Sequence, residues 1–434
     1  MAVFQAKILN NKSIYQFRCR LCAIFGLILS CYWVPTSAAT VAVSPGVGSL
    51  QQAITAARAG DTLVLSAGRY HGSITIDRAI NLTAESPATS VIVGDGAQHV
   101  IVVAAADVSI QNLKITGSGV DLSTEDSGIF VTEAGDRALI RNNRIEGNLI
   151  GIYLKGPIDA RVIGNRIIGR DDLHLSEAGN GIHLWNTPGS VVEDNDVSGG
   201  RDGIFVTTSR DNIFRNNHFR DLRFAIHYMY TNHSRVENNR SSGNHMGYAI
   251  MFSSHLHVYN NVSIDDRDKG IFLNFTNDSE FADNDVNGSP EKCLFIYNSH
   301  FNSIVRNRFR GCDIGVHFTA GSEDNSISSN SFDGNRMQVK YVGTRLLEWS
   351  ENGVGNYWSD HVAFDRNRDG IADNHYQPNN LVDQIVWRHA SAKVLLNSPA
   401  LQLLHWAQSQ FPALHPGGVV DSAPLMQSQW ASQQ

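Results

Sequence analysis

Apolar and polar residues alternate in short stretches along most of the chain. Several stretches contain a string such as GIFV, GIYL, GIHL or GIFL, and these strings begin at Gly128, Gly151, Gly181, Gly203 and Gly270. Period-two alternation of β-branched and aromatic residues predicts β-strands. Because no run of helical period interrupts the series, this part of the chain is expected to be built from strands and corners.

An asparagine recurs at a fixed interval and defines the length of a repeat. Its copies are Asn143, Asn165, Asn195, Asn217, Asn239, Asn261, Asn284, Asn307 and Asn330. Successive copies lie 22 or 23 residues apart, except for one interval of 30 that holds a polar insert at residues 170–179. An apolar residue precedes each copy by three positions. A propeller blade would need about twice this period, and leucine-rich repeats would show leucines at fixed places.

We therefore predict an all-β fold, a right-handed single-stranded parallel β-helix in which each repeat of about 22–23 residues forms one coil. Asparagine suits the corners because it tolerates left-handed backbone and can bond to its own turn. Asparagines on successive coils, roughly 4.8 Å apart, would also bond to one another. The string SLQQAITAARA at residues 49–59 predicts a helix that caps the first coil.

Four segments follow from the changes in pattern. Residues 1–39 read as a signal peptide, residues 40–345 as the β-helix, and residues 346–396 as a region with a calcium-loop-like motif. Residues 397–434 read as a helix followed by an extended tail, because apolar residues there first have helical spacing and prolines then recur.

The first segment has the plan of a Sec-type signal peptide. Basic residues without any acidic residue precede an apolar run at residues 21–34, and small residues follow it. The run is too short for a comfortable membrane span, so a retained anchor or a lipidated Cys31 is the weaker alternative. We expect the mature chain to be exported.

The net charge limits the kinds of partner, and the cysteine content allows one disulfide. The chain has 35 Lys and Arg against 42 Asp and Glu, a net charge of −7. This balance argues against a nucleic-acid partner held through phosphates. Beyond the signal peptide only Cys293 and Cys312 remain, and they would either form a disulfide in an oxidising compartment or stay as two buried thiols.

Methionine and histidine recur together on two neighbouring repeats. Met229 and Met251 are 22 residues apart, as are His233 and His255, while His227 shares the outward parity of Met229. Thioether and imidazole are ligands that Cu(I) selects. These five residues are our hypothesis for a transient copper site. The alternative is that the methionines fill gaps and the histidines decorate polar turns.

The outward slot of the alternating strings carries mostly aromatic residues. Its members are Phe130, Tyr153, His183, Phe205, His227, Ala249, Phe272, Phe295 and His317. An aromatic stripe on one face of a solenoid either binds something external or is covered by the tail of the chain. The pattern leaves both options open.

A second metal motif lies after the repeats. Asp365, Asn367, Asp369 and Asp373, with a glycine in the turn, match a DxNxDGxxD calcium loop. Tyr376 stands where a bidentate glutamate would be expected. The segment is therefore either a structural Ca²⁺ site or an Asx-rich turn without a metal.

Many β-helices act on acidic polysaccharides, so catalysis needs a separate test. The candidate groups are Asp171, Asp172 and His174 in the insert and a charged run at residues 265–269. No two carboxylates share one outward slot on adjacent coils, as paired acid and base chemistry would favour. We predict that the chain is not an enzyme. The alternative is a polysaccharide-binding protein, lyase or epimerase.

Three strings carry a family resemblance: AIHYMYTNHS, GNYWSDHVAFDRNRDGIADNHYQPNNLVD and SPALQLLHWAQSQFPALHPGGVVDSAPL. With them the mature chain resembles the NosD family, periplasmic maturation proteins of nitrous oxide reductase. The resemblance implies partners: the permease and ATPase subunits of an ABC transporter, a copper-chaperone lipoprotein and the reductase, whose copper-sulfur centre is assembled.

The same resemblance implies peripheral attachment to the inner membrane through the transporter complex. The carboxyl-terminal segment from about residue 397 would dock on the permease, with Leu401, Leu404, Trp406 and Phe411 as contact residues. The chain has no GxxxxGK[ST] string, so any ATP would be hydrolysed by a partner.

Overall fold

The computed structural model describes residues 38–343, 345–378, 385, 391, 398–410 and 418–431. The chain divides into residues 1–37 and residues 38–434, and all described residues belong to the second unit. The predicted signal peptide, apart from its last two residues, therefore lies outside the described residues.

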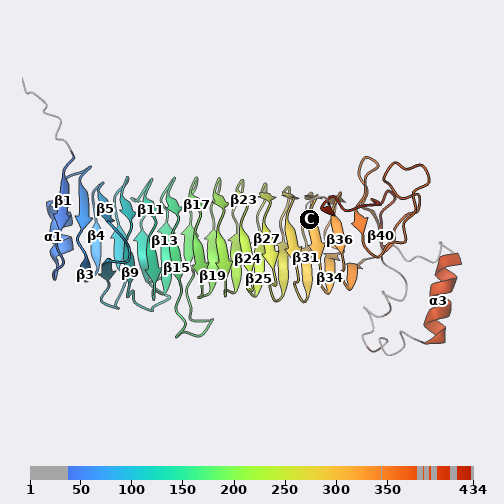
Figure 1. The fold of residues 1–434 in the computed structure, drawn as a ribbon, viewed down its shortest axis with the longest axis horizontal. Helices are drawn as coiled ribbons and strands as arrows, with labels where there is room; N and C mark the ends of the chain where they lie inside the picture. The colour runs from blue at the N-terminus through green and yellow to red at the C-terminus, as the bar shows by residue number, and fades with distance from the viewer. Residues whose placement is uncertain are drawn as a thin grey trace, which may run out of the picture. The chain divides into compact units, whose positions relative to one another are not determined.

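The described chain winds into stacked coils, and each complete coil adds one strand to each of three parallel sheets (Figure 1). We number these sheets I, II and III, and their strands are given in the next three paragraphs. The chain passes from sheet II to sheet I, then to sheet III, and returns to sheet II one coil further on. This is the predicted right-handed parallel β-solenoid, with about 14 turns.

Sheet I has 13 strands. They are β1 (Thr40–Val43), β2 (Thr62–Leu65), β5 (Asn81–Ala84), β8 (Ser109–Gln111), β11 (Leu139–Arg141), β14 (Arg161–Ile163), β17 (Val191–Glu193), β20 (Ile213–Arg215), β23 (Arg235–Glu237), β26 (His257–Tyr259), β29 (Glu280–Ala282), β32 (Ser303–Val305) and β35 (Ser326–Ser328).

Sheet II has 12 strands. They are β4 (Ile74–Ile76), β7 (Ile101–Val103), β10 (Ser127–Val131), β13 (Ile150–Lys155), β16 (Ile182–Trp185), β19 (Asp202–Thr207), β22 (Phe224–Met229), β25 (Met246–Met251), β28 (Lys269–Asn274), β31 (Lys292–Tyr297), β34 (Ile314–Thr319) and β37 (Met337–Val342).

Sheet III has 13 strands. They are β3 (Gly68–His71), β6 (Ser90–Val93), β9 (Lys114–Thr116), β12 (Arg144–Glu146), β15 (Arg166–Ile168), β18 (Asp196–Ser198), β21 (His218–Arg220), β24 (Arg240–Ser242), β27 (Val262–Ile264), β30 (Asp285–Asn287), β33 (Arg308–Arg310), β36 (Ser331–Asp333) and β39 (Tyr357–Trp358).

The interior is filled by the columns that the repeat predicts. In sheet I, for example, Val192, Phe214, Val236 and Val258 follow one another in register and are all fully buried. Each such side chain contributes about 1.5–3 kcal/mol when it is removed from water. Because every coil pairs in register with the next, any repeated position becomes a column along the solenoid.

The corner between sheets I and III holds a ladder of buried asparagines. The side-chain oxygen of Asn217 accepts the backbone N–H and the side-chain amide of Asn195, at 3.0 and 2.9 Å. Asn217 in turn donates both kinds of bond to Asn239, each at 3.0 Å. The same bonding pattern runs from Asn143 to Asn356. The predicted contact between stacked asparagines is therefore confirmed.

The left-handed residue of this corner is not the ladder asparagine but the residue before it. Asn216, Asn238 and Asn260 have φ of 57°, 58° and 54°, whereas the ladder asparagines do not adopt positive φ. The preceding residue makes the bend, and the ladder residue can then aim its N–H along the stack. Our expectation that the ladder asparagines themselves would be left-handed was wrong in this detail.

Both ends of the solenoid are covered. Helix α1 (Ser49–Ala56) buries Leu50 and Ile54 and caps the first coils as predicted. At the other end, β38 (Leu346–Glu348) pairs with β40 (Gly418–Val420). The buried carboxylate of Asp421 accepts the N–H of Asn356 at 2.7 Å and the indole N–H of Trp358 at 2.8 Å. Residues 418–421, which the sequence analysis placed in the docking tail, thus help to close the last coils.

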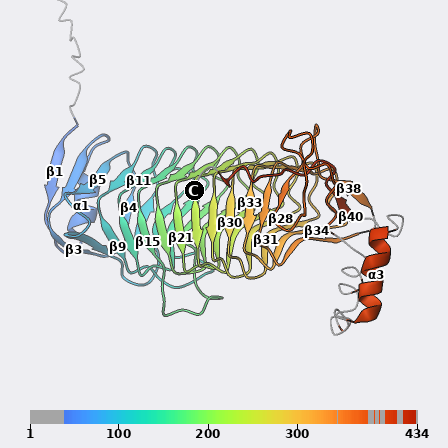
Figure 2. The same ribbon diagram turned by 45° about the vertical axis from the view of Figure 1, so that its right-hand side comes forward.

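Two further features distinguish the individual coils. Cys293 in β31 and Cys312 in the turn before β34 form a disulfide, with Cα atoms 5.7 Å apart, which joins adjacent coils. This decides between the two alternatives that the sequence left open. The polar insert forms a long loop between β15 and β16 that stands out from the row of coils in both views (Figure 1, Figure 2).

At one corner between sheets III and II (the III–II corner), the buried carboxylate of Asp266 stands where the preceding coil has the neutral Asn244. Asp266 accepts a backbone N–H from Asn244 at 2.9 Å and hydroxyl hydrogen bonds from Ser241 and Ser263 at 2.7 and 2.5 Å. Burial raises the pKa of Asp266 from 3.8 to about 6, because these hydrogen bonds only partly offset the loss of hydration.

Removal of one ladder asparagine should destabilise the solenoid strongly. Asn239→Ala leaves the buried N–H and amide of Asn217 and the carbonyl of Phe214 without their partner. We expect the free energy of unfolding in urea to fall by about 3–5 kcal/mol. Asn238→Gly in the same turn is the matched control, because glycine accepts the φ of 58°. Equal losses for both variants would contradict the ladder's role.

The raised pKa of Asp266 predicts a pH-dependent stability. The folded protein holds this proton to higher pH than the unfolded chain, so the contribution of Asp266 is fully present below pH 3.8 and is lost as pH rises through about 6. The loss amounts to about 3 kcal/mol. Asp266→Asn should remove this component, whereas Asp265→Asn at the exposed neighbour should keep it. Parallel pH profiles for wild type and Asp266→Asn would refute the assignment.

Candidate functional site

The two predicted methionine ligands lie side by side on the outer face of sheet II. Met229 ends β22 and Met251 ends β25, and the two residues are register partners. Both side chains are partly exposed. Thr207 precedes them in the column and Asn274 follows. Neighbouring strands are about 4.8 Å apart, so the two methionines are direct neighbours on this face.

His227 lies two residues before Met229 on the same face. Its Nδ1 is 3.0 Å from the carboxylate of Asp202, which is buried and also bonded to Arg223 at 2.7 Å. Burial alone would raise the pKa of Asp202, but the hydrogen bonds from His227 and Arg223 outweigh it and hold this pKa below its ordinary value. A carboxylate on one ring nitrogen orients the other, as in many metal-binding histidines.

His233 and His255 form a second pair at the corner where the chain passes from sheet II to sheet I. Their rings stack with centroids 4.7 Å apart, and both residues are exposed and have positive φ. Along each coil three residues separate them from the methionines. The structure thus groups the five candidates as His227 with two methionines on sheet II and a histidine pair around the corner. Within the described ranges, no group of three or more His, Cys, Asp or Glu could hold a metal ion.

The corner also carries aromatic residues whose importance the sequence analysis missed. Tyr230 stacks on Phe252 with centroids 5.1 Å apart, and Phe252 stacks on Phe275 at 5.2 Å. We call these three residues the corner ladder. Their repeat at an interval of 22 or 23 was visible in the sequence. Their exposure was not, because periodicity alone does not distinguish a corner from a strand.

The aromatic stripe of sheet II is in register as predicted. His183, Phe205 and His227 follow one another with ring centroids 4.9 Å apart. Burial lowers the pKa of His183 to about 4. Leu173 from the insert packs against the small cluster of Leu149, Ile150 and Tyr153, which includes one residue of the stripe.

The described part of the tail lies along a different edge. The indole N–H of Trp430 donates to the carbonyl of Arg306 at 3.2 Å, and the Ser428 hydroxyl bonds to Ser331 at 2.8 Å. These partners belong to the I–III corner and to sheet III. The described tail residues 418–431 therefore do not cover the aromatic stripe.

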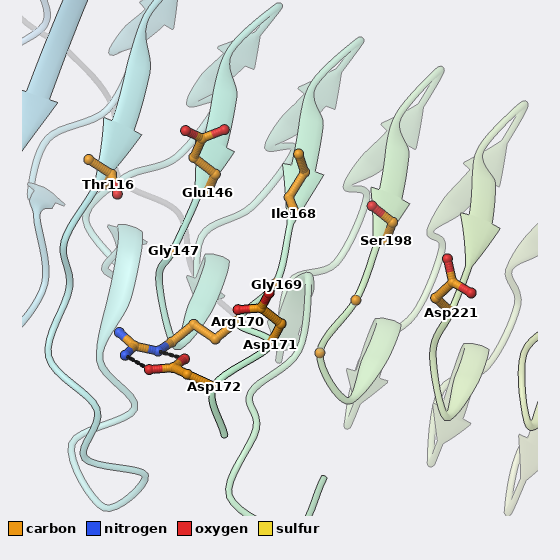
Figure 3. Close-up of a pocket in the computed structure, with 12 residues that line it drawn as sticks. Thr116, Glu146, Gly147, Ile168, Gly169, Arg170, Asp171, Asp172, Ser198 and Asp221 are labelled. Carbon is orange, nitrogen blue, oxygen red and sulfur yellow. Dashed lines mark hydrogen bonds and ion pairs between the residues drawn. The ribbon is translucent and has the colours of Figure 1, made fainter. Parts of the chain in front are cut away.

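A cleft of about 920 Å³ lies between the insert and the outer face of sheet III. Glu146, Asp171, Asp172 and Asp221 line it, together with Arg170, which points toward Asp172 (Figure 3). A hydrogen bond from Arg170 is the main reason why the pKa of Asp172 lies below its ordinary value. That shift is opposite to what a general acid at neutral pH needs.

The other catalytic candidates are occupied in structural contacts. His174 pairs with Ser176 at 2.8 Å inside the insert. Asp266 is fully buried in the III–II corner. Asp268 is bonded to Lys269, which lies over the ring of Phe272. None of these candidates forms an open pair of carboxylates.

The calcium-loop motif forms a turn held by its own side chains. Asp365 accepts the N–H of Gly370 at 2.9 Å, Asn367 donates to Asp369 at 2.8 Å, and Asp373 accepts a backbone N–H at 2.7 Å. These contacts correspond to the Asx-rich turn that the sequence left as the alternative. They give the calcium prediction no support.

The predicted docking helix is present as α3 (Pro399–Gln410). Leu401, Leu404 and Trp406 fall within it, and Phe411 lies outside the described residues. Among the helices of the described ranges, none is both long and apolar enough to cross a membrane. The docking role of this segment stays a prediction.

Solved structures with similar coils confirm the fold. The A-module of the mannuronan C-5 epimerase AlgE6 from Azotobacter vinelandii has a TM-score of 0.53 at 14% identity, covering 67% of this chain and 89% of that module. The amino-terminal fragment of the bacteriophage Phi29 gene product 12 has a TM-score of 0.52 at 12% identity, covering 68% of this chain and 66% of that fragment. At this level of identity the likeness concerns the fold alone.

Sequence comparison is more specific. Residues 163–363 match the family model described as periplasmic copper-binding protein (NosD). A "probable ABC transporter binding protein NosD" of Stutzerimonas stutzeri is 40% identical over 376 residues, covering 83% of this chain and 86% of that protein. Its namesake in Pseudomonas aeruginosa is 41% identical over 375 residues, covering 83% of this chain and 87% of that protein. The chain therefore belongs to the NosD family.

Proposed function

We propose that this protein is a periplasmic accessory factor that positions copper for assembly of the copper centre of nitrous oxide reductase. The observation that carries the proposal is the register pairing of Met229 with Met251 on the outer face of sheet II. Membership in a family described as periplasmic and copper-binding supports both the compartment and the metal.

The ligand chemistry favours Cu(I). Two thioethers offer soft donors, and His227 lies on the same face with its Nδ1 held by the carboxylate of Asp202. The carboxylate of Asp202 is buried and already bonded to Arg223, so it supports the histidine and does not attract a hard ion. His233 and His255 would receive or release the ion at the neighbouring corner. Few and partly exposed ligands suit transfer better than storage.

The proposal assigns the energy-consuming step to a partner. Relatives named as ABC transporter binding proteins support an association with permease and ATPase subunits, for which α3 is our candidate docking segment. The chain carries no phosphate-binding GxxxxGK[ST] string. A copper-chaperone lipoprotein would supply the ion, and the reductase would receive it.

Replacement of the methionine pair should abolish copper retention. Met229→Leu with Met251→Leu keeps size and apolarity but removes both sulfur donors. We expect anaerobically purified wild type to retain Cu(I) through desalting, and we expect the double variant to lose at least about tenfold in affinity, measured by competition with a chromogenic chelator. Met337→Leu on β37 is the matched control and should behave as wild type.

Two results would count against the proposal. Equal Cu(I) affinity in the double variant would exclude the methionine pair as ligands. Binding of uronate oligomers by a wild-type chain that retains no copper would favour the polysaccharide-binding alternative.

A further inference from the structure

Asp202 and Arg223 form a buried ion pair beside one of the predicted copper ligands. Arg223 donates to the two carboxylate oxygens of Asp202 at 2.7 and 2.5 Å, and the Nδ1 of His227 lies 3.0 Å from one of these oxygens. Only 1% of the Asp202 side chain and 22% of the Arg223 side chain are exposed. The guanidinium also lies 3.5 Å from the Nδ1 of His227. A positive charge is therefore fixed next to the imidazole ring.

The solenoid does not require an acidic residue at this place. The register partners of Asp202 on the next four coils are the apolar or basic residues Phe224, Met246, Lys269 and Lys292. Removing two charges from water is costly, and well-packed apolar residues of similar volume often serve a fold as well or better. The ion pair is thus a local feature of the coils that carry His227, and folding alone does not explain it.

Aromatic rings hold the ion pair and the histidine in place. The guanidinium carbon of Arg223 lies 4.4 Å from the ring centroid of Phe224. The centroid of the His227 ring lies 5.1 Å from that of Phe224 and 4.9 Å from that of Phe205. The His227 side chain is only 12% exposed. Because water screens charges poorly in such surroundings, the charges next to His227 act strongly on a bound ion.

Net charge affects which ions such a site accepts. The cost of moving an ion from water into apolar surroundings grows with the square of its charge, so a divalent ion loses more hydration free energy than Cu(I) does. An unpaired carboxylate would offset that loss. With Arg223 in place the ion pair has no net charge, and both oxygens of Asp202 already accept hydrogen bonds. Cu(I) is bound well by neutral thioether and imidazole ligands.

We propose that Arg223 is a specificity-determining residue that makes the copper site selective for Cu(I) against divalent ions. Its positive charge cancels that of Asp202 and leaves neutral donors as the ligand set. Asp202 is a positioning residue for His227 and does not coordinate the ion itself. The inference rests on the proposed copper function for the identity of the site, but it makes a separate claim about how divalent ions such as Zn²⁺ are excluded.

The test measures the affinities of the exported chain for Zn²⁺ and for Cu(I) in separate anaerobic competitions with chromogenic chelators. Arg223→Gln removes the charge and keeps a hydrogen-bond donor toward Asp202. We expect its Zn²⁺ affinity relative to its Cu(I) affinity to rise at least about tenfold. Arg223→Lys keeps the charge and should recover most of the wild-type selectivity. Adding Asp202→Asn to Arg223→Gln makes the pair neutral again and should cancel the gain.

A matched control lies on another sheet. Arg220 donates to both carboxylate oxygens of Asp196 at 2.5 and 3.3 Å, and its side chain is 40% exposed. Arg220→Gln also removes one positive charge from an ion pair. It should leave the selectivity unchanged, because this pair lies on sheet III and His227 lies on sheet II. The melting temperature of each variant shows whether it is folded.

Each outcome decides one claim. Equal selectivity in wild type and Arg223→Gln would overturn the role of Arg223. An equal gain in Arg223→Lys or in Arg220→Gln would also overturn it, because the charge beside His227 would then not be the cause. Failure of wild type to bind Cu(I) would count against the proposed copper function alone. A higher Zn²⁺ affinity of Arg223→Gln, measured without copper, would still support the exclusion of divalent ions by Arg223.

Discussion

The buried asparagine ladder holds successive coils in register, and every column of side chains along the solenoid requires that register. From Asn165 to Asn330, each ladder residue receives two hydrogen bonds from the coil before it and gives two to the coil after it, as Asn217 does with Asn195 and Asn239. A slip by one residue would break every bond of this kind and would turn the apolar columns outward. Repeated sequence positions therefore become fixed columns on the surface.

The functional hypothesis is a consequence of that geometry. Methionine at one position of two repeats becomes a thioether pair, and histidine four residues later becomes a stacked imidazole pair. The solenoid interior is closed by packed side chains, so chemistry is confined to the outer face. Asp202 adds an element that repetition does not supply, since it approaches His227 from the preceding coil.

The fold could be predicted because its signals are periodic: the asparagine interval, the apolar column and the capping helix all survive in the sequence. For the candidate site, the sequence predicted only which residues lie in the same column on successive coils. Side-chain contacts across coils, such as that between Asp202 and His227, depend on rotamers and burial that spacing does not encode. The same holds for the bond between Cys293 and Cys312, which occupy different slots of the repeat, and for the left-handed aromatic residues after Met229.

In the proposed copper site, two adjacent coils present sulfur ligands to the metal. X-ray absorption at the copper edge, recorded on the anaerobic Cu(I)-loaded protein, tests this claim most directly, because sulfur and nitrogen neighbours scatter differently. A copper ion on the methionine pair should show two sulfur neighbours together with imidazole nitrogen, and the sulfur contribution should disappear when Met229 and Met251 are both leucine. A first shell of nitrogen and oxygen alone, or a sulfur contribution that survives the double substitution, would contradict it.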